Sequence, residues 1–174
     1  MEYQHIIHPI PPFYDSTSKV LILGSFPSVK TRESGFFYGH PQNRFWRVLA
    51  AVLDTPVPET IEEKITLLIR NRIALWDVIA SCDITGSSDS SIRHVIPTDL
   101  TPILAGGTIR AVFTNGGTAT RLYKRYQEPV TALPAIGLPS TSPANAAKSL
   151  DALTKDWMVL RRYLFDEPYR NQHL

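Results

Sequence analysis

The sequence contains very little cysteine and no long hydrophobic segment. Cys82 is the only cysteine among 174 residues, which excludes an internal disulfide framework and a cysteine-rich zinc site. No apolar run approaches the roughly 20 residues that a membrane-spanning helix needs. The first residues, MEYQHIIHPIPP, lack the basic and apolar regions of a secretory signal peptide. We therefore expect a cytoplasmic protein, nucleoid-associated in a bacterium, with no membrane partner.

Several common catalytic motifs are also missing. There is no G-x-G-x-x-G motif and no P-loop lysine, so no nucleotide cofactor is expected. There is no G-x-S-x-G motif, which argues against Ser25 and Ser28 as acyl-transfer nucleophiles. The five histidines show no metal-ligand spacing, since even His5 and His8 lie in a proline-rich arm. The sequence predicts neither a cofactor nor a metal ion.

Length and composition are those of one globular domain. The chain is 43% hydrophobic and 20% charged, with a formal net charge of +2. Basic side chains gather in two segments: residues 16–53 carry five against one acid, and residues 100–127 carry four and no acid. Two such segments suit a polyanionic partner, although clustering by chance on a solvated surface gives the same pattern.

Short apolar segments alternate with helical patterns along the chain. This order predicts an α/β fold, a three-layer αβα sandwich around a four-stranded, mainly parallel sheet. We expect one domain over 19–165, an irregular N-terminal arm over 1–18, a polar tail over 166–174, and long loops over 29–41 and 81–96. The expected strands are 19–23, 73–78, 109–114 and 131–138, and the expected helices are 42–53, 60–70, 99–104, 116–126 and 143–165, the last capped by Ser142.

Ligands of such sheets bind beyond the carboxyl ends of the strands. Two junctions there are rich in small and hydroxyl residues, GSFPS at 24–28 and LPSTSP at 138–143. Backbone N–H groups and hydroxyls at strand ends suit phosphate, but the same residues also dominate ordinary turns. Asp77 ends a predicted strand on the same side, where it could position water or pair with a cation, although a structural role is the simpler interpretation.

Between the junctions lies the loop GFFYGHPQNRFW, residues 35–46. Phe36, Phe37 and Tyr38 offer a surface on which a base could stack, or they pack back onto the core. Asn43, at the start of the next predicted helix, is either a capping residue or a polar group directed into the cleft.

The stretch GSFPSVKTRESGFFYGHPQNRFW resembles the first motif and base-binding loop of the uracil-DNA glycosylase superfamily. LPSTSPANA resembles the second motif of that superfamily, and IALWDVIASCDITGSSDSSIRHVIP resembles its hypoxanthine-DNA glycosylase branch. The resemblance covers about residues 20–165. Two positions depart from the usual pattern: Phe26 stands where relatives carry the Asp or Asn that holds the attacking water, and Leu138 stands where they carry a His or Asn that bonds a uracil carbonyl.

The resemblance implies a monofunctional DNA glycosylase that flips a deaminated base, hypoxanthine first, and hydrolyses its N-glycosidic bond in base excision repair. Asn43 matches the catalytic asparagine of the hypoxanthine branch, and Tyr38 matches the aromatic residue that stacks on the base. The expected partner is DNA bound by a monomer, and no lysine stands out as a Schiff-base nucleophile. Further expected contacts are to the base from Ser25, Phe26, Phe37 and Leu138, and to phosphates from Ser28, His40, Ser140, Thr141 and Ser142.

Three other functions fit parts of the pattern. A mismatch uracil-DNA glycosylase would share the motifs, although Phe26 and Leu138 both lack the polar groups used for uracil. A catalytically silent DNA-binding relative is consistent with Phe26. A phosphate-handling hydrolase acting on free nucleotides would need clustered carboxylates for Mg²⁺, and the sequence shows none.

Overall fold

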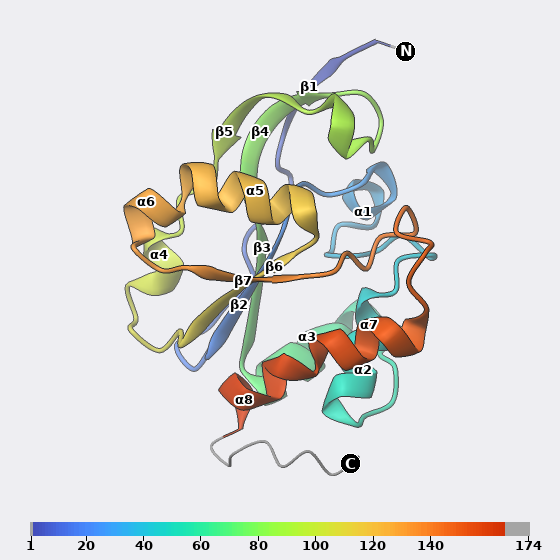
Figure 1. Ribbon diagram of the computed structural model, residues 1–174, viewed down its shortest axis with the longest axis vertical. Coiled ribbons are helices and arrows are strands. Elements are labelled where there is room, and N and C mark those ends of the chain that lie inside the picture. The colour runs from blue at the N-terminus through green and yellow to red at the C-terminus, as the bar shows by residue number, and fades with distance from the viewer. Residues whose placement is uncertain (1, 166–174) are drawn as a thin grey trace.

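The computed structural model describes residues 2–165, so the expected tail 166–174 lies outside the described residues. Its centre is a four-stranded parallel sheet in the order β3-β2-β6-β7 (Figure 1). This arrangement confirms the α/β fold class. The strands are β2 (Val20–Gly24), β3 (Ile73–Asp77), β6 (Ala111–Asn115) and β7 (Ala135–Leu138).

Helices cover both faces of this sheet, which makes the three predicted layers. Alternate residues of β2 enter different cores: Ile22 belongs to the core that contains Leu49 and Trp157, and Leu23 to the core that contains Leu122. Figure 1 shows one layer of helices below the sheet and one above it. The lower layer contains α2 (Phe45–Leu53), α3 (Ile61–Asn71), α7 (Leu150–Trp157) and α8 (Arg161–Leu164). The upper layer contains α4 (Thr101–Leu104), α5 (Gly117–Tyr126) and α6 (Glu128–Thr131).

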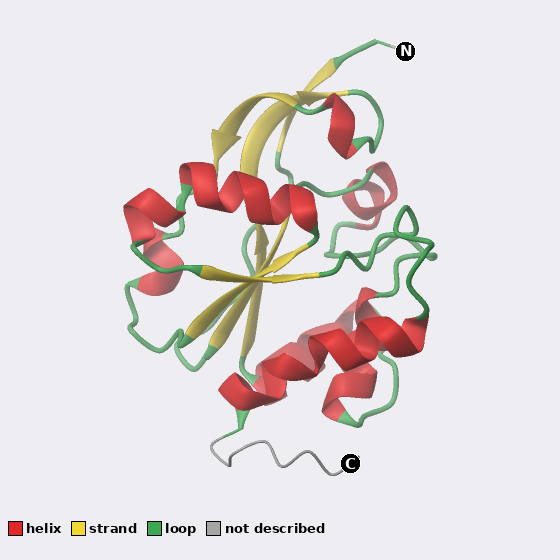
Figure 2. Cartoon of the chain, viewed as in Figure 1, coloured by secondary structure: helices red, strands yellow, loops and turns green. Residues whose placement is uncertain are grey.

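A second sheet was not predicted. β1 (Gln4–Ile7) pairs antiparallel with β4 (Ile79–Ile84), and β4 pairs antiparallel with β5 (Arg93–Pro97), as the upper strands of Figure 2 show. The expectations of an irregular arm and of an unstructured loop over 81–96 were therefore wrong. The pairing joins segments far apart in the chain, and the exposed β1 and β5 lack the continuous apolar run that predicts a strand.

Three local elements also differ from expectation. The loop 29–41 contains the short helix α1 (Val29–Ser34), which Ser28 caps. The strand expected over 131–138 is shortened, because α6 extends to Thr131. The last helix does not start at Pro143: α7 starts at Leu150 with Ser149 as its cap, and residues 139–149 form an irregular loop. The single-turn 3₁₀ helices are η1 (Asp89–Ser91) and η2 (Met158–Leu160).

Arg44 ties this loop to the start of α2. Its guanidinium donates hydrogen bonds to the carbonyls of Lys148, Asn145 and Ser142, and its backbone N–H donates to the carbonyl of Thr141. The Ser142 and Asn145 carbonyls also accept the backbone N–H groups three residues further on, so the chain forms turns here and not the i→i−4 bonds of an α-helix. The loop is therefore fixed beside the start of α2.

In the described part of the chain, no helix is both long and apolar enough to cross a membrane.

Candidate active site

A pocket of about 370 Å³ opens at the carboxyl edge of the parallel sheet. Gly24 and Asp77 end neighbouring strands in register and lie on one side of it, and Asn115 ends the next strand. This is the edge at which the sequence predicted a ligand site. The pocket is lined by Gly24, Ser25, Phe26, Pro27, Ser28, Thr31, Phe37, Tyr38, Asn43, Asp77, Ser87, Ser88, Asp89, Ser90, Asn115, Ser140, Thr141, Ser142 and Ala144.

Asn43 is held in one orientation by two donors. The backbone N–H of Phe45 donates to Asn43 Oδ1 at 2.9 Å, and the Thr141 hydroxyl donates to the same oxygen at 2.9 Å. A backbone N–H can only donate, so the oxygen of the amide is identified and both of its lone pairs are used. The NH₂ group of Asn43 makes no hydrogen bond to any described residue. The Asn43 side chain thus accepts the first N–H of α2, whose N-cap residue is Arg44, and its NH₂ is left as a donor at the pocket.

Asn115 fixes Thr141 in turn. Its Nδ2 donates to Thr141 Oγ1 at 3.0 Å, and its Oδ1 accepts the backbone N–H of Thr141 at 3.1 Å. Asn115 and Thr141 are both buried, so this chain of bonds is largely shielded from water. The sequence analysis did not select Asn115, although its place at the end of the strand on the ligand side was a usable signal.

The aromatic side chains at the pocket pack against other parts of the protein, so their rings are not fully free to stack on a base. Phe37 is buried in the core. Tyr38 has one face of its ring stacked on Phe45, with the centroids 4.0 Å apart and the planes 19° apart. Its hydroxyl is buried beside Asn115 and makes no direct hydrogen bond within residues 2–165. Phe26 is buried against the edge of the His8 ring at 5.7 Å.

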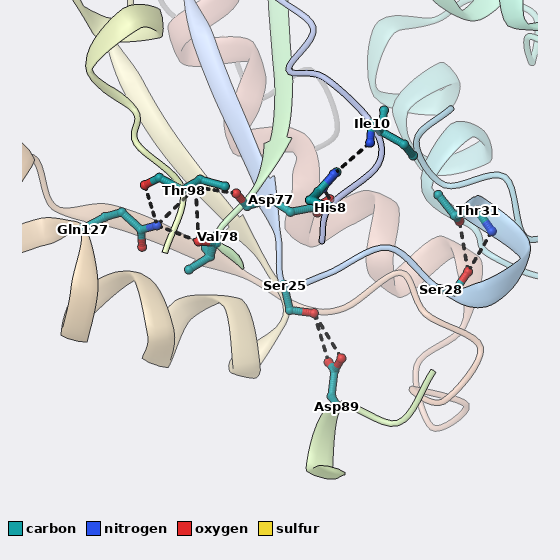
Figure 3. Close-up of polar contacts among 10 residues, drawn as sticks. All are labelled: His8, Ile10, Ser25, Ser28, Thr31, Asp77, Val78, Asp89, Thr98 and Gln127. Atoms are coloured by element: carbon teal, nitrogen blue, oxygen red, sulfur yellow. Dashed lines mark hydrogen bonds and ion pairs between the residues drawn. The ribbon is translucent and has the colours of Figure 1, made fainter. Parts of the chain in front are cut away.

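Asp77 lies at the pocket and contacts the N-terminal arm. His8 Nε2 and Asp77 Oδ2 are 2.7 Å apart, and both side chains are almost fully buried (Figure 3). His8 was not selected from the sequence as a site residue, because nothing local indicates a contact 69 positions away. The arm therefore supplies a direct neighbour of the pocket.

Ser25 and Asp89 form a second polar pair. The Ser25 hydroxyl donates to the Asp89 carboxylate at 3.1 and 3.3 Å (Figure 3), which links the end of β2 to η1. Partial burial raises the pKa of the Asp89 carboxyl, and hydrogen bonds from Ser25 and Thr118 oppose that shift. Asp89 is a second pocket carboxyl that the sequence analysis did not select.

The remaining predicted residues divide into two groups. Ser28, Ser140 and Ser142 line the pocket, and Ser28 also accepts the Thr31 N–H at the start of α1. His40 and Leu138 are not among the lining residues: His40 Nδ1 accepts the Gln42 N–H, and Leu138 is buried in the core. Among residues 2–165, no three His, Cys, Asp or Glu side chains lie close enough together to hold a metal ion.

A model of the Uracil DNA glycosylase superfamily matches residues 11–163. The chain belongs to this superfamily. This protein is similar in structure to a Methanosarcina acetivorans protein solved by solution NMR, which is provisionally described as a uracil DNA glycosylase. The TM-score is 0.78 and the identity 30%, over 91% of this chain and 99% of that one.

Two curated relatives are named hypoxanthine DNA glycosylase. The relative from Methanosarcina barkeri is 34% identical over 84 residues, which are 48% of this chain and 53% of the relative. The relative from Methanosarcina acetivorans is 37% identical over 83 residues, which are 47% of this chain and 52% of the relative. The aligned segments thus span about half the length of each relative.

Proposed function

We propose that this member of the superfamily is a monofunctional DNA glycosylase that removes deaminated bases, hypoxanthine before uracil or xanthine, and acts as a monomer. The observation that carries the proposal is the orientation of Asn43: its oxygen is used by Phe45 and Thr141, and its NH₂ remains a donor at the pocket. The names of the two Methanosarcina relatives support hypoxanthine as the first choice.

The pocket suits a single flipped base. Its volume of about 370 Å³ falls in the range of roughly 300–1,000 Å³ typical of small-molecule sites. A base inside a duplex is out of reach of such a pocket, so the nucleotide must be turned out of the stack first. Ser140 and Ser142, on the loop that Arg44 holds, are the groups we assign to the DNA backbone on the same rim.

Hydrolysis of the N-glycosidic bond breaks the bond between C1′ and the base nitrogen. The sugar gains oxocarbenium character while the base leaves with the bonding electron pair. A water molecule adds to C1′, and its proton passes to the departing base or to solvent. The Asn43 NH₂ donates a hydrogen bond to the negative charge that develops on the base, and this interaction is strongest in the transition state.

Because Phe26 stands where relatives carry an Asp or Asn, the first motif lacks the side chain that would hold the attacking water. Phe26 cannot accept a proton or orient water, and its ring is buried. Catalysis in this proposal therefore rests on stabilising the leaving base. Uracil is a weaker fit, because Leu138 is apolar, buried, and not among the residues that line the pocket.

The test uses duplexes that each hold one hypoxanthine, uracil or xanthine. Hot alkali cuts the strand wherever a base has been removed. We expect the purified protein to release hypoxanthine fastest, and Asn43→Ala to lower the single-turnover rate by about 10²–10³-fold with little change in DNA affinity. No residue that lines the pocket is a lysine, so the strand should stay intact before alkali.

A second function is favoured by Phe26 itself. If the missing water-holding residue means that chemistry is lost, the protein is a DNA-binding relative without activity. It would then bind the same duplexes in a salt-sensitive way and release no base. Excision that depends on Asn43 rules out this alternative, and equal rates for wild type and Asn43→Ala remove Asn43 from the mechanism.

A further inference from the structure

Of the two carboxyl side chains that line the pocket, Asp77 and Asp89, only one is open to solvent. Asp77 is 4% exposed, and its Oδ2 lies 2.7 Å from His8 Nε2. Asp89 is an exposed residue of the same pocket. The proposed function leaves the attacking water without a protein partner, because Phe26 stands at the position of the usual Asp or Asn. Asp89 is therefore the pocket carboxylate that a water molecule can reach.

Asp89 is bonded to the first motif, although it comes from a distant segment. Ser25, the neighbour of Phe26, donates its hydroxyl to Asp89 Oδ1 at 3.1 Å and to Oδ2 at 3.3 Å (Figure 3). The Ser25 carbonyl accepts the Ile79 N–H at 3.2 Å, which fixes the backbone after β2 against the start of β4. The carboxylate is thus tied to the residue next to the position that holds the attacking water in relatives.

The loop that carries Asp89 is fixed by further hydrogen bonds. The Ser87 hydroxyl oxygen accepts the Val29 N–H at 2.9 Å, which joins the loop to α1. The Thr85 N–H donates to the Ser91 hydroxyl oxygen at 2.9 Å and closes the turn around η1. The carboxylate therefore has a set position before any substrate binds, and a positioned group has little freedom to lose when it takes up a water.

The surroundings of Asp89 make its carboxylate a better proton acceptor than an ordinary exposed aspartate. Partial burial raises the pKa of the carboxyl above its usual value, and hydrogen bonds from Ser25 and Thr118 oppose part of that shift. A carboxylate with a higher pKa takes a proton more readily, provided that it is still ionised at the working pH. The other charged or titratable groups that interact with it are Asp77 at the end of β3, Arg121 on α5 and Cys82 on β4.

We propose that Asp89 is a catalytic residue that holds the attacking water and accepts its proton. This inference rests on the proposed function, since it supplies the nucleophile of the glycosylase reaction. A carboxylate has about four lone-pair positions, so the donors Ser25 and Thr118 leave room for a water. The water oxygen bonds to C1′ while the bond from C1′ to the base nitrogen breaks and the base takes the electron pair. One water proton moves to Asp89, which then releases it to the departing base or to solvent.

Asn43 and Asp89 then serve the two halves of the reaction. The Asn43 NH₂ stabilises the leaving base, and its oxygen is held by Phe45 and Thr141. Asp89 serves the water and is held by Ser25. A negative charge in a DNA pocket repels phosphate, so a role in binding does not explain Asp89. Removal of this charge should leave the DNA affinity equal or higher and lower the rate.

Three variants test the assignment on a duplex that holds hypoxanthine. Asp89→Asn keeps an oxygen for Ser25 but loses the proton acceptor, so the single-turnover rate should fall by about 10²–10⁴-fold with no loss of DNA affinity. Ser25→Ala removes the same hydrogen bond and keeps the carboxylate, so its rate should fall by only about threefold to tenfold. Asp83→Asn changes a carboxylate of the β4–β5 hairpin that does not line the pocket, and it should keep the wild-type rate.

Two further measurements distinguish proton transfer from a structural role. The wild-type rate should fall as the pH drops through the raised pKa of Asp89, because a protonated carboxyl cannot accept a proton, and Asp89→Asn should lack this acidic limb. Formate, added at constant ionic strength, supplies a carboxylate from solution. It should raise the rate of Asp89→Ala in proportion to its concentration and should leave the rate of Ser25→Ala unchanged.

Each contrary outcome has a separate meaning. Equal rates for wild type and a folded Asp89→Asn protein overturn the role of Asp89 and leave the proposed function standing. Equal losses in Asp89→Asn and Ser25→Ala, with no response of Asp89→Ala to formate, show that the pair only fixes the loop, which also overturns this role. A wild-type protein that binds the duplex and releases no base contradicts the proposed function itself, and the role of Asp89 fails with it.

Discussion

The Thr141 hydroxyl donates a hydrogen bond to the amide oxygen of Asn43, across 98 positions of the sequence. This bond joins the first family motif to the second. The Phe45 N–H and the Thr141 hydroxyl together use both lone pairs of the Asn43 oxygen. Only the NH₂ group of Asn43 is then left, and it acts as a donor. The second motif thus orients Asn43 in addition to lining the pocket itself.

Thr141→Val tests this positioning. Valine keeps the shape of threonine but removes the hydroxyl, so Asn43 keeps the Phe45 bond alone and can tilt. The loss of one hydrogen bond is worth about 0.5–1.5 kcal/mol, so the single-turnover rate should fall by about threefold to tenfold, much less than in Asn43→Ala. Thr154→Val, which removes an exposed hydroxyl bonded to Leu150 on α7, should leave the rate unchanged. A Thr141→Val rate equal to wild type would show that Phe45 alone suffices.

Gly24→Ala tests the space beside Asp77. The added Cβ would lie 2.5 Å from Asp77 Oδ1 and 3.0 Å from the Tyr38 hydroxyl, so one or both must move. We expect excision of hypoxanthine to fall by about tenfold or more, because this wall of the pocket is displaced. Gly106→Ala is the control, since nothing lies within 4 Å of its added Cβ. If Gly24→Ala keeps the full rate, the position of these side chains does not matter to excision.

Arg44→Met tests what fixes the loop over 139–149. The guanidinium holds three carbonyls of this loop, and methionine keeps the apolar stem without the donors. Amide hydrogen exchange in the loop should become about tenfold faster or more, because bonds to a charged donor contribute about 1.5–3 kcal/mol. Exchange in β2 should not change. Arg47→Met, on an exposed position of α2, should leave both segments as they are.

The Cys82 thiol should be unreactive in the native protein. It is buried, and this burial, followed by the charge of Asp83, raises its pKa from 9.0 to about 11. Labelling with a thiol reagent at pH 8 should therefore be slow and should follow unfolding. Rapid labelling of folded protein would contradict the burial of this residue.

The same shift makes the protein sensitive to alkali. The raised native pKa means that the thiol ionises first in the unfolded chain, so the free energy of unfolding falls as pH rises from about 9 to about 11. The expected loss is on the order of 1–3 kcal/mol. Cys82→Ala lowers stability at neutral pH by leaving a small void, but it should flatten this part of the pH profile in urea unfolding. An unchanged slope would assign the alkaline loss to other groups.

The sequence predicted the central sheet because its strands carry their own signal. Segments such as VLIL at 20–23 are apolar on both faces, which only a buried parallel strand requires. The upper sheet carries no such signal. Its edge strands β1 and β5 are largely exposed, and β1 exists because it pairs with a segment nearly 80 positions further along the chain. Local patterns do not report such pairing.

The candidate site divides in the same way. Asn43 and Thr141 lie in motifs that the resemblance identifies, so both were selected, although Thr141 was expected to contact phosphate and in the structure is buried and bonds to Asn43. His8 lies outside those motifs, and its importance comes from a contact with Asp77 that only the folded chain creates. The start of the last helix could not be placed from Ser142 and Pro143, because the loop that follows them is held by Arg44, which is distant in the sequence.

The N-terminal arm also protects an edge. β1 pairs along one side of β4 and is itself only four residues long. Its outer side therefore offers few unpaired N–H and C=O groups to which another strand could bond. Without residues 1–18, β4, a strand of six residues, would become an edge strand and would expose the N–H and C=O groups that now pair with β1. A shortened chain that begins at Lys19 would keep every motif of the family, yet it would present an edge on which a second molecule could add a strand. Self-association, as well as the loss of His8, is therefore the outcome to expect from trimming the arm.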